Sequence, residues 1–209
     1  MKDYTKKTIE FYDRNVEEYI ENTKNLQDKK WLERFVSYLS KNARILDLGC
    51  AYGRDCKFFV DNGFETHGVD LSSKLIERAK SSVKGAKFYI MDILDLKFPN
   101  ENFDGVWCSA TLLHIKKKDV SKALSEIKRV LKKGGILYLN LKEGVGEKAV
   151  KDERYEGAEK FYSYFTENEI KGMLTEIGFK TLDFELVLRK ESYMRNAGTI
   201  YLIARKVKP

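Results

Sequence analysis

A glycine-containing turn early in the chain begins directly after Asp47 and is followed by a second acidic residue, Asp70. Residues 47–55 read Asp-Leu-Gly-Cys-Ala-Tyr-Gly-Arg-Asp, and Gly49 and Gly53 permit a tight turn with close approach of the backbone to a ligand. Asp70 follows about 20 residues later, a spacing at which a carboxylate can accept hydrogen bonds from ribose hydroxyls. A carboxylate at Asp47 would repel a diphosphate and attract an ammonium or sulfonium group. The pattern therefore favours a nucleoside joined to an amino acid as the ligand.

Two other nucleotide sites are disfavoured by the same turn. A dinucleotide turn of the type Gly-x-Gly-x-x-Gly needs three glycines, but the corresponding positions hold Gly49, Ala51 and Arg54. The third glycine lets the following helix pack closely on the strand, which arginine cannot do. No Gly-Lys-Ser/Thr sequence follows the turn, so a P-loop is also absent. A dehydrogenase is accordingly a distant alternative.

The elements that must position these residues are read from the hydrophobic pattern, which alternates strands with helices. Such alternation implies right-handed crossovers and a parallel sheet covered on both faces. In such sheets the ligand lies at the carboxyl ends of the strands, where the strand order reverses. Strands are expected at residues 44–49, 65–70, 86–91, 103–109 and 136–141, and helices at residues 54–61, 72–83 and 119–132.

The two ends of the chain have different patterns. Apolar residues at helical spacing predict an N-terminal cap of two helices, at 4–22 and 28–39. The sequence from Thr166 to Glu169 is a capping box that opens a helix ending at Gly178. Strands at 181–188 and 199–204 have no helix between them and should form an antiparallel hairpin at one edge of the sheet. We expect a single domain, with a cap over 1–42, a cofactor-binding core over 43–145, and an acceptor-side segment with the final hairpin over 146–209.

The motifs together resemble those of the class I S-adenosylmethionine-dependent methyltransferases. Ala51 stands where that family usually has a glycine, a difference that matters only if residue 51 needs a positive φ angle. The resemblance implies a Rossmann-like three-layer α/β sandwich, with a seven-stranded, mostly parallel sheet whose last strand is antiparallel. The segments that carry it are residues 45–53, 68–72, 91–93, 103–114 and 129–137.

The resemblance also implies a cofactor, S-adenosyl-L-methionine, with S-adenosyl-L-homocysteine as the product, and a set of binding residues. Asp47, Gly49 and Gly53 would line the methionine end. Tyr12 and Tyr19 would close over the cofactor, or would simply form the apolar face of their helix. The expected cofactor-binding residues are Asp47, Gly49, Cys50, Ala51, Gly53, Asp70, Leu71, Ser72, Asp92, Ile93, Ser109, Tyr12 and Tyr19.

The remaining cofactor roles follow the strand order of the family. Asp70 would bind the ribose, and Leu71 would pack beside the adenine. Asp92 and Ile93 would contact the adenine, and Ser109 would lie under the sulfonium.

The acceptor side is less specified. Methyl transfer is an in-line displacement, and a base is needed only if the nucleophile must lose a proton. His114 follows the strand at 103–109 and is a candidate general base or substrate contact, with a structural histidine as the alternative. The long segment 142–165 is interpreted as an acceptor-covering segment with Arg154 and Tyr155 as candidate contacts, or as an amphipathic cover of the sheet. Arg189, Tyr193 and Arg195 could give a positive rim for an anionic acceptor, or could be plain surface.

Composition limits the classes of function. The chain has 209 residues and a net charge of +7, with lysines interleaved with glutamates, which fits a solvated surface or attraction to an anionic partner such as RNA. The leading hypothesis is methylation of a small molecule. The alternatives are methylation of tRNA and a non-catalytic, cofactor-binding regulatory subunit.

The cysteines and the apolar runs bear on the environment. Three cysteines without Cys-x-x-Cys spacing argue against a disulfide scaffold or a cysteine metal site. No apolar run approaches the roughly 20 residues of a membrane span, and no apolar stretch resembling a secretion signal opens the chain. We expect a cytoplasmic protein that neither binds a metal nor enters a membrane, and the sequence leaves its oligomeric state open.

Overall fold

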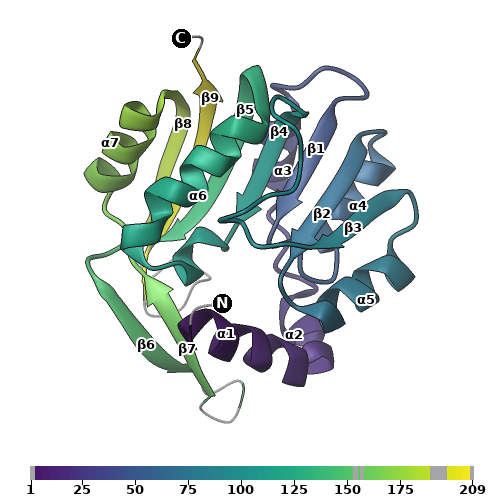
Figure 1. Ribbon diagram of the computed structural model, residues 1–209, viewed down its shortest axis with the longest axis vertical. Coiled ribbons are helices and arrows are strands. Elements are labelled where there is room, and N and C mark those ends of the chain that lie inside the picture. Colours follow the sequence, from purple (N-terminus) through teal and green to yellow (C-terminus); the bar gives the residue numbers. More distant parts are fainter. Residues whose placement is uncertain (1–2, 153–154, 156–157, 189–196, 208–209) are drawn as a thin grey trace.

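Strands and helices alternate along the chain and build one central sheet (Figure 1). The computed structural model describes residues 3–152, 155, 158–188 and 197–207. The seven strands lie in the order β3-β2-β1-β4-β5-β9-β8, and β9 is antiparallel to both of its neighbours. The mostly parallel sheet and its antiparallel last strand are thereby confirmed. The strands are β1 Arg44–Leu48, β2 Glu65–Asp70, β3 Ala86–Ile90, β4 Phe103–Ser109, β5 Leu131–Lys142, β8 Phe179–Val187 and β9 Thr199–Lys206.

Helices cover both faces of the sheet because side chains alternate along each strand. On β1, Ile45 joins the aromatic cluster beneath α3 and α4, whereas Leu46 and Leu48 join the aliphatic cluster beneath α6 and α7. In the aromatic cluster the rings of Trp107 and Tyr138 are stacked with centroids 3.6 Å apart. The helices are α1 Asp3–Arg14, α2 Val16–Thr23, α3 Lys29–Val36, α4 Arg54–Asp61, α5 Ser73–Ser82, α6 Lys117–Val130 and α7 Glu167–Ile177, with the short 3₁₀ helix η1 at Leu112–His114.

The strand order reverses between β1 and β4, which place their carboxyl ends side by side. In Figure 1 these ends face α1 and α2, which lie across them. The expected helix over residues 4–22 is wrong in one respect, because it is broken at Asn15, whose φ of −115° is not helical. The Asn15 side chain donates to the Phe11 carbonyl at 2.8 Å, a local bond that competes with helix continuation. The break lets the two halves lie at different angles over the sheet.

Two further boundaries differ from expectation. The helix expected to reach Lys132 ends at Val130, and β5 starts at Leu131 rather than Ile136 because Leu131 already pairs with Phe103 across a register shift. The segment 142–165 is not an irregular loop. Half of its residues form a separate two-stranded antiparallel sheet, β6 (Glu147–Asp152) with β7 (Ala158–Ser163).

The capping devices predicted from the sequence are confirmed. The Ser72 side chain caps α5 by accepting from the Leu75 amide at 3.1 Å. Thr166 and Glu169 form the capping box of α7, which ends at Gly178 in a left-handed conformation. Within the part of the chain that the structure describes, no helix is both long and apolar enough to cross a membrane.

Candidate active site

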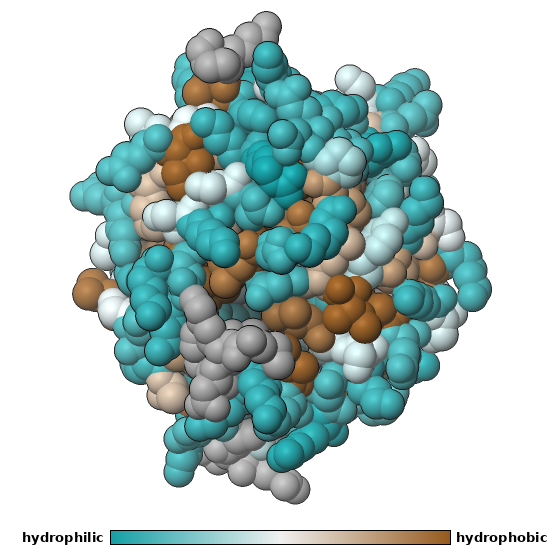
Figure 2. Space-filling model, viewed as in Figure 1, coloured by the Kyte–Doolittle hydropathy of each residue, from teal (hydrophilic) through white to brown (hydrophobic). Residues whose placement is uncertain are grey.

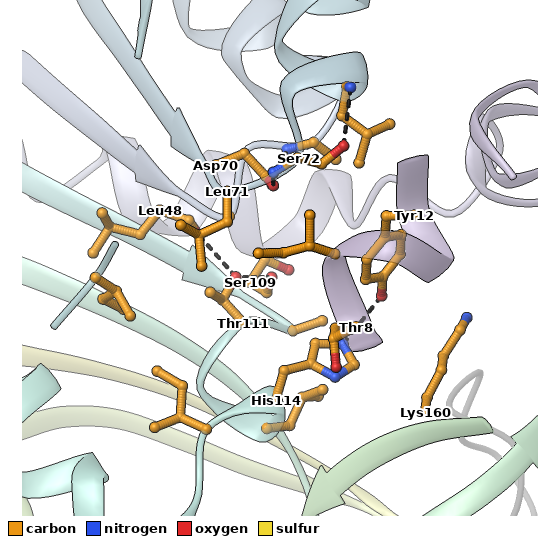
Figure 3. A pocket seen from close by; sticks show the side chains of 18 of the residues that line it. Thr8, Tyr12, Leu48, Asp70, Leu71, Ser72, Ser109, Thr111, His114 and Lys160 are labelled. Atoms are coloured by element: carbon orange, nitrogen blue, oxygen red, sulfur yellow. Dashed lines mark hydrogen bonds between the residues drawn. The ribbon is translucent and has the colours of Figure 1, made fainter. Parts of the chain in front are cut away.

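A cavity of about 250 Å³ lies at the carboxyl ends of β1, β2 and β4, under α1 and α2. Figure 2 shows apolar side chains reaching the surface near the centre of this face, above α1, within a mostly hydrophilic surface. The cavity brings together residues that the sequence placed in one site (Figure 3). Those of the predicted residues that line it are Tyr12, Tyr19, Gly49, Ala51, Asp70, Leu71, Ser72, Asp92, Ile93, Ser109, His114 and Tyr155.

The turn after β1 packs very closely against Thr111, another residue of the cavity wall. Gly49 has a φ of +74°, and a Cβ placed there would lie 2.0 Å from Oγ1 of Thr111. That hydroxyl lies 2.8 Å from the Leu48 carbonyl, to which it can donate. Ala51 also has a positive φ, +47°, a conformation that costs an L-residue roughly 1–2 kcal/mol. Ala51 therefore has the positive φ angle at which its difference from the family's usual glycine causes backbone strain.

Asp70 is fixed at the end of β2 by backbone donors. Its Oδ2 accepts from the Ala51 amide at 3.0 Å, and its Oδ1 accepts from the Ser72 amide at 2.9 Å. Burial raises the pKa of this carboxyl, and hydrogen bonds from the backbone oppose that rise. Each carboxylate oxygen has a further lone pair with which to accept a ligand hydroxyl.

Three turn residues predicted to contact the cofactor do not line the cavity. Asp47 is 3% exposed and accepts a hydrogen bond from the Cys56 thiol, with a sulfur–oxygen distance of 3.2 Å. Cys50 packs with Cys56 in the buried cluster between α4 and α5, and Gly53 caps α4 with a left-handed backbone. Burial, and then the nearby Asp55, raise the pKa of Asp47. These residues support the turn from behind, and their contact with the cofactor stays a prediction.

A buried ion pair joins the turn to α2. The Asp55 side chain, 6% exposed, accepts two hydrogen bonds from Arg54 at 2.8 and 3.0 Å, and one from Nε1 of Trp107 at 3.1 Å. Arg54 in turn donates to the carbonyl of Thr23, at the end of α2, at 3.1 Å. Gln27 donates to the carbonyl of Arg54 at 3.1 Å. Arg54, which is incompatible with a dinucleotide turn, therefore ties the N-terminal helices to the site.

The aromatic residues of α1 and α2 form one wall of the cavity. The rings of Tyr12 and Tyr19 meet edge to face with centroids 5.0 Å apart. Ser72 donates to the Asp13 carboxylate at 2.5 Å, which fastens α1 to the start of α5. Tyr12 and Tyr19 both line the cavity. That they close over a bound cofactor stays a prediction.

His114 lies at the end of η1 with both ring nitrogens in hydrogen bonds. Nδ1 is 3.0 Å from the Phe161 carbonyl, and Nε2 is 3.1 Å from the Tyr12 hydroxyl. Because a carbonyl can only accept, the proton lies on Nδ1, and Nε2 accepts from Tyr12. Burial lowers the pKa of His114 to about 4, so the ring is neutral at pH 7.

This lowered pKa predicts a pH dependence of stability. Unfolded histidine titrates near 6.5, so between pH 6.5 and about pH 4 the unfolded chain binds a proton that the folded chain does not. Stability contributed by the neutral ring is complete above pH 6.5 and is lost as the pH falls towards 4. Urea unfolding at pH 7 and pH 4 should show the wild type losing roughly 3 kcal/mol more than His114→Gln. Equal losses in the two proteins would contradict the burial of a neutral ring.

Several lining residues were not predicted from the sequence. Thr111 lies two residues beyond β4, and its position after a strand end was the available signal. Lys160 and Tyr162 come from β7, whose charged, short sequence gives no strand signal. Lys142 ends β5 and also lines the cavity. Arg154 and the rim residues Arg189, Tyr193 and Arg195 lie outside the described residues.

Comparison with known proteins shows to which kind of domain the cavity belongs. Residues 46–139, which span β1 to the middle of β5, match a family model described as a methyltransferase domain. These residues form a methyltransferase domain of the class I S-adenosylmethionine-dependent type. Methyltransferases of this class take S-adenosylmethionine as their cofactor.

Relatives and solved structures agree with this assignment. Phosphoethanolamine N-methyltransferase of Plasmodium falciparum is 28% identical over 149 residues, covering 69% of this chain and 56% of that protein. A probable methyltransferase of Aspergillus luteorubrus is 38% identical over 114 residues, covering 48% of this chain and 40% of that protein. The chain thus spans about half the length of these relatives.

The fold is shared with crystal structures of other methyltransferases. An S-adenosylmethionine-dependent methyltransferase of Methanosarcina mazei has a TM-score of 0.74 and 24% identity, covering 83% of this chain and 96% of that one. A Burkholderia thailandensis N1-methyltransferase, solved with S-adenosylhomocysteine, has a TM-score of 0.74 and 20% identity, covering 100% and 92% of the two chains. The cavity described above lies in this shared fold.

The residues that line the cavity fit S-adenosylmethionine on chemical grounds. Asp70 offers open lone pairs to a ribose diol beside the apolar side chains of Leu71 and Ile93. Tyr12 and Tyr19 also line the cavity, and aromatic rings suit a sulfonium cation. Among the described residues, no group of three or more histidines, cysteines or carboxylates could hold a metal ion.

Proposed function

We propose that the protein transfers the methyl group of S-adenosylmethionine to a small-molecule acceptor. The observation that carries the proposal is the carboxylate of Asp70, held by backbone amides at the wall of a cavity whose opposite side carries His114. A carboxylate in that position recognises a ribose and repels a phosphate. α1 covers the cavity, which supports a small acceptor.

In this proposal each side chain has a stated task. Asp70 accepts hydrogen bonds from the ribose, and Leu71, Asp92 and Ile93 contact the adenine. The backbone of the turn approaches the amino-acid part, since Gly49 and Ala51 line the cavity. Asp47, Cys50 and Gly53 hold the turn in shape. Ser109 lies at the end of β4, below the sulfonium.

The acceptor end supplies alignment and a proton acceptor. When bound, S-adenosylmethionine supplies a methyl carbon whose bond to sulfur breaks as the acceptor's lone pair bonds to it, leaving a neutral thioether. Tyr12 and His114 receive the proton of an acceptor hydroxyl: the Tyr12 hydroxyl takes it and passes its own to Nε2 of His114. The hydroxyl proton becomes strongly acidic as the oxygen–methyl bond forms, so a ring whose pKa is lowered to about 4 can still receive it. α1 and the β6–β7 hairpin exclude water from the cavity.

Methylation of tRNA and a non-catalytic regulatory role are the alternatives. The net charge of +7 favours RNA, as does the similarity to a probable tRNA methyltransferase of Mus musculus, 29% identical over 138 residues. In that case ribonuclease treatment of the acceptor pool would abolish activity. Turnover by the purified chain alone would exclude a purely regulatory role. We also infer a reducing compartment such as the cytoplasm, because Cys50, Cys56 and Cys108 are buried free thiols.

Replacement of Asp70 tests the proposal directly. Asp70→Ala should weaken S-adenosylhomocysteine binding by about 1–3 kcal/mol, roughly 5- to 150-fold in Kd, because the ribose hydroxyls lose their acceptor. Calorimetry measures the affinity, and the thermal midpoint checks that the variant is folded.

An exposed carboxylate of the neighbouring helix supplies the control. Glu77 lies on α5, outside the cavity, so Glu77→Ala should bind like the wild type. Unchanged affinity in Asp70→Ala, with the protein folded, would remove Asp70 from the cofactor site.

A further inference from the structure

The two ends of the cavity carry opposite charges. Among the described lining residues, the carboxylates are Asp70 at the end of β2 and Asp92 just after β3. The lysines are Lys142 at the end of β5 and Lys160 on β7. β2 and β5 are three strand positions apart in the sheet, or about 14 Å. Figure 3 shows Asp70 on one side of the cavity, with His114 and Lys160 on the other.

Lys160 is held in a site built around its ammonium group. The residue is 2% exposed, and Nζ lies 4.0 Å from the ring centroid of Phe11 and 4.2 Å from that of Tyr155. Asp152 forms an ion pair with Nζ at 3.3 Å and does not line the cavity, so this carboxylate holds the ammonium from the side away from the cavity. A buried ammonium is costly unless such partners stabilise it, so the chain keeps this charge at the cavity wall by a specific arrangement.

Lys142 adds a second ammonium to the same end. It is 8% exposed, and Nζ lies 4.8 Å from the ring centroid of Tyr162, another lining residue. Both lysines also act on the neutral His114, whose pKa their charges lower further. The acceptor end thus presents two ammonium groups to the cavity, with the Asp152 partner of Lys160 outside the lining and tyrosine hydroxyls nearby. At such a buried surface electrostatic interactions are stronger than in water.

From this arrangement we propose that the acceptor is an anion. Its carboxylate or phosphate group binds at Lys142 and Lys160, and its nucleophilic atom lies beside Tyr12 and His114. A cationic acceptor would bring its charge against two ammonium groups with no facing carboxylate among the described lining residues. This inference rests on the proposed methyl transfer and adds the chemical class of the acceptor.

The test separates a cell extract by charge before the reaction. Ion exchange at neutral pH gives anionic, neutral and cationic pools of small molecules, and each pool is incubated with the purified protein and methyl-labelled S-adenosylmethionine. The label should enter the anionic pool at least tenfold more than either other pool. Phosphatase treatment of that pool distinguishes a phosphate ester from a carboxylate. Preferential labelling of the cationic or neutral pool would overturn the inference while leaving methyl transfer intact.

Lysine variants assign the effect to the cavity. Lys142→Met and Lys160→Met should each lower labelling of the anionic pool by about tenfold or more, with S-adenosylhomocysteine affinity within about twofold of the wild type. Lys160→Arg should retain much of the activity because it keeps the positive charge. It also keeps a partner for Asp152, so it separates loss of the charge from a folding defect. Lys151→Met, which removes an exposed lysine of β6, should behave as the wild type. Full labelling by both methionine variants would contradict the inference.

A binding experiment keeps the two proposals distinguishable. If no pool is labelled although the protein binds S-adenosylhomocysteine, the proposed transferase function fails. Calorimetric titration of the S-adenosylhomocysteine complex with inorganic phosphate and with propionate then tests whether an anion binds at Lys142 and Lys160, independently of methyl transfer. Binding of either probe to the wild type, weakened about tenfold or more in Lys142→Met, supports the site. Absence of binding by both probes overturns it.

Discussion

His114→Gln is expected to lower kcat by about 10²- to 10⁴-fold, with little change in S-adenosylhomocysteine affinity. The variant keeps a polar side chain of similar size but cannot accept a proton as imidazole does. In the structure Nδ1 donates to the Phe161 carbonyl, which leaves Nε2 free to receive a proton from Tyr12. Single-turnover transfer of labelled methyl to the acceptor pool measures the chemical step.

The partner hydroxyl provides a sharper form of the same test. Tyr12→Phe removes the group that links His114 to the acceptor, so we expect a loss of similar size. Because the two residues act as a unit, the double variant should lose little more than the slower single variant. His67→Gln, which replaces a histidine outside the cavity, should keep kcat within about twofold. Multiplicative losses in the double variant, or full activity in His114→Gln, would contradict a shared proton path.

Asp55→Ala is expected to lower the free energy of unfolding by about 3–5 kcal/mol. The substitution leaves Arg54, whose side chain is 25% exposed, without its carboxylate partner, and it leaves the buried N–H of Trp107 without an acceptor. It also loosens the attachment of α2 to the turn, because Arg54 contacts the Thr23 carbonyl. Urea unfolding measures the loss.

The same helix contains a matched control. Asp61 on α4 forms an ion pair with Lys57 at 2.9 Å, and both side chains are more than half exposed. Asp61→Ala should therefore cost less than about 1 kcal/mol. If Asp55→Ala cost no more than Asp61→Ala, the buried network could not be what holds the N-terminal helices on the site.

The parts of the fold that local signals specify were predicted well. β2, β4 and α4 have the expected bounds because strand alternation, the glycine turn and the stop after Asp61 are all short-range features. Asp70 was located from its distance to the turn, since one crossover brings the end of β2 beside the end of β1. The capping box of α7 is likewise a four-residue signal.

The remainder depends on tertiary contacts that a single sequence does not reveal. Asp47 lies outside the cavity lining because side chains alternate along β1 and its face of the strand is covered by α4, so its contact with a cofactor stays a prediction. Lys160 and Tyr162 reach the cavity because the β6–β7 hairpin folds against α1, an arrangement that charged strands do not indicate. The break at Asn15 is set by one side-chain hydrogen bond.

A crystal structure of the protein with S-adenosylhomocysteine would test the central claim most directly. We expect the ribose hydroxyl oxygens within about 3 Å of the Asp70 carboxylate. The sulfur should face the side of the cavity that carries Tyr12 and His114. Density for the ligand elsewhere, or a ribose turned away from Asp70, would contradict the account.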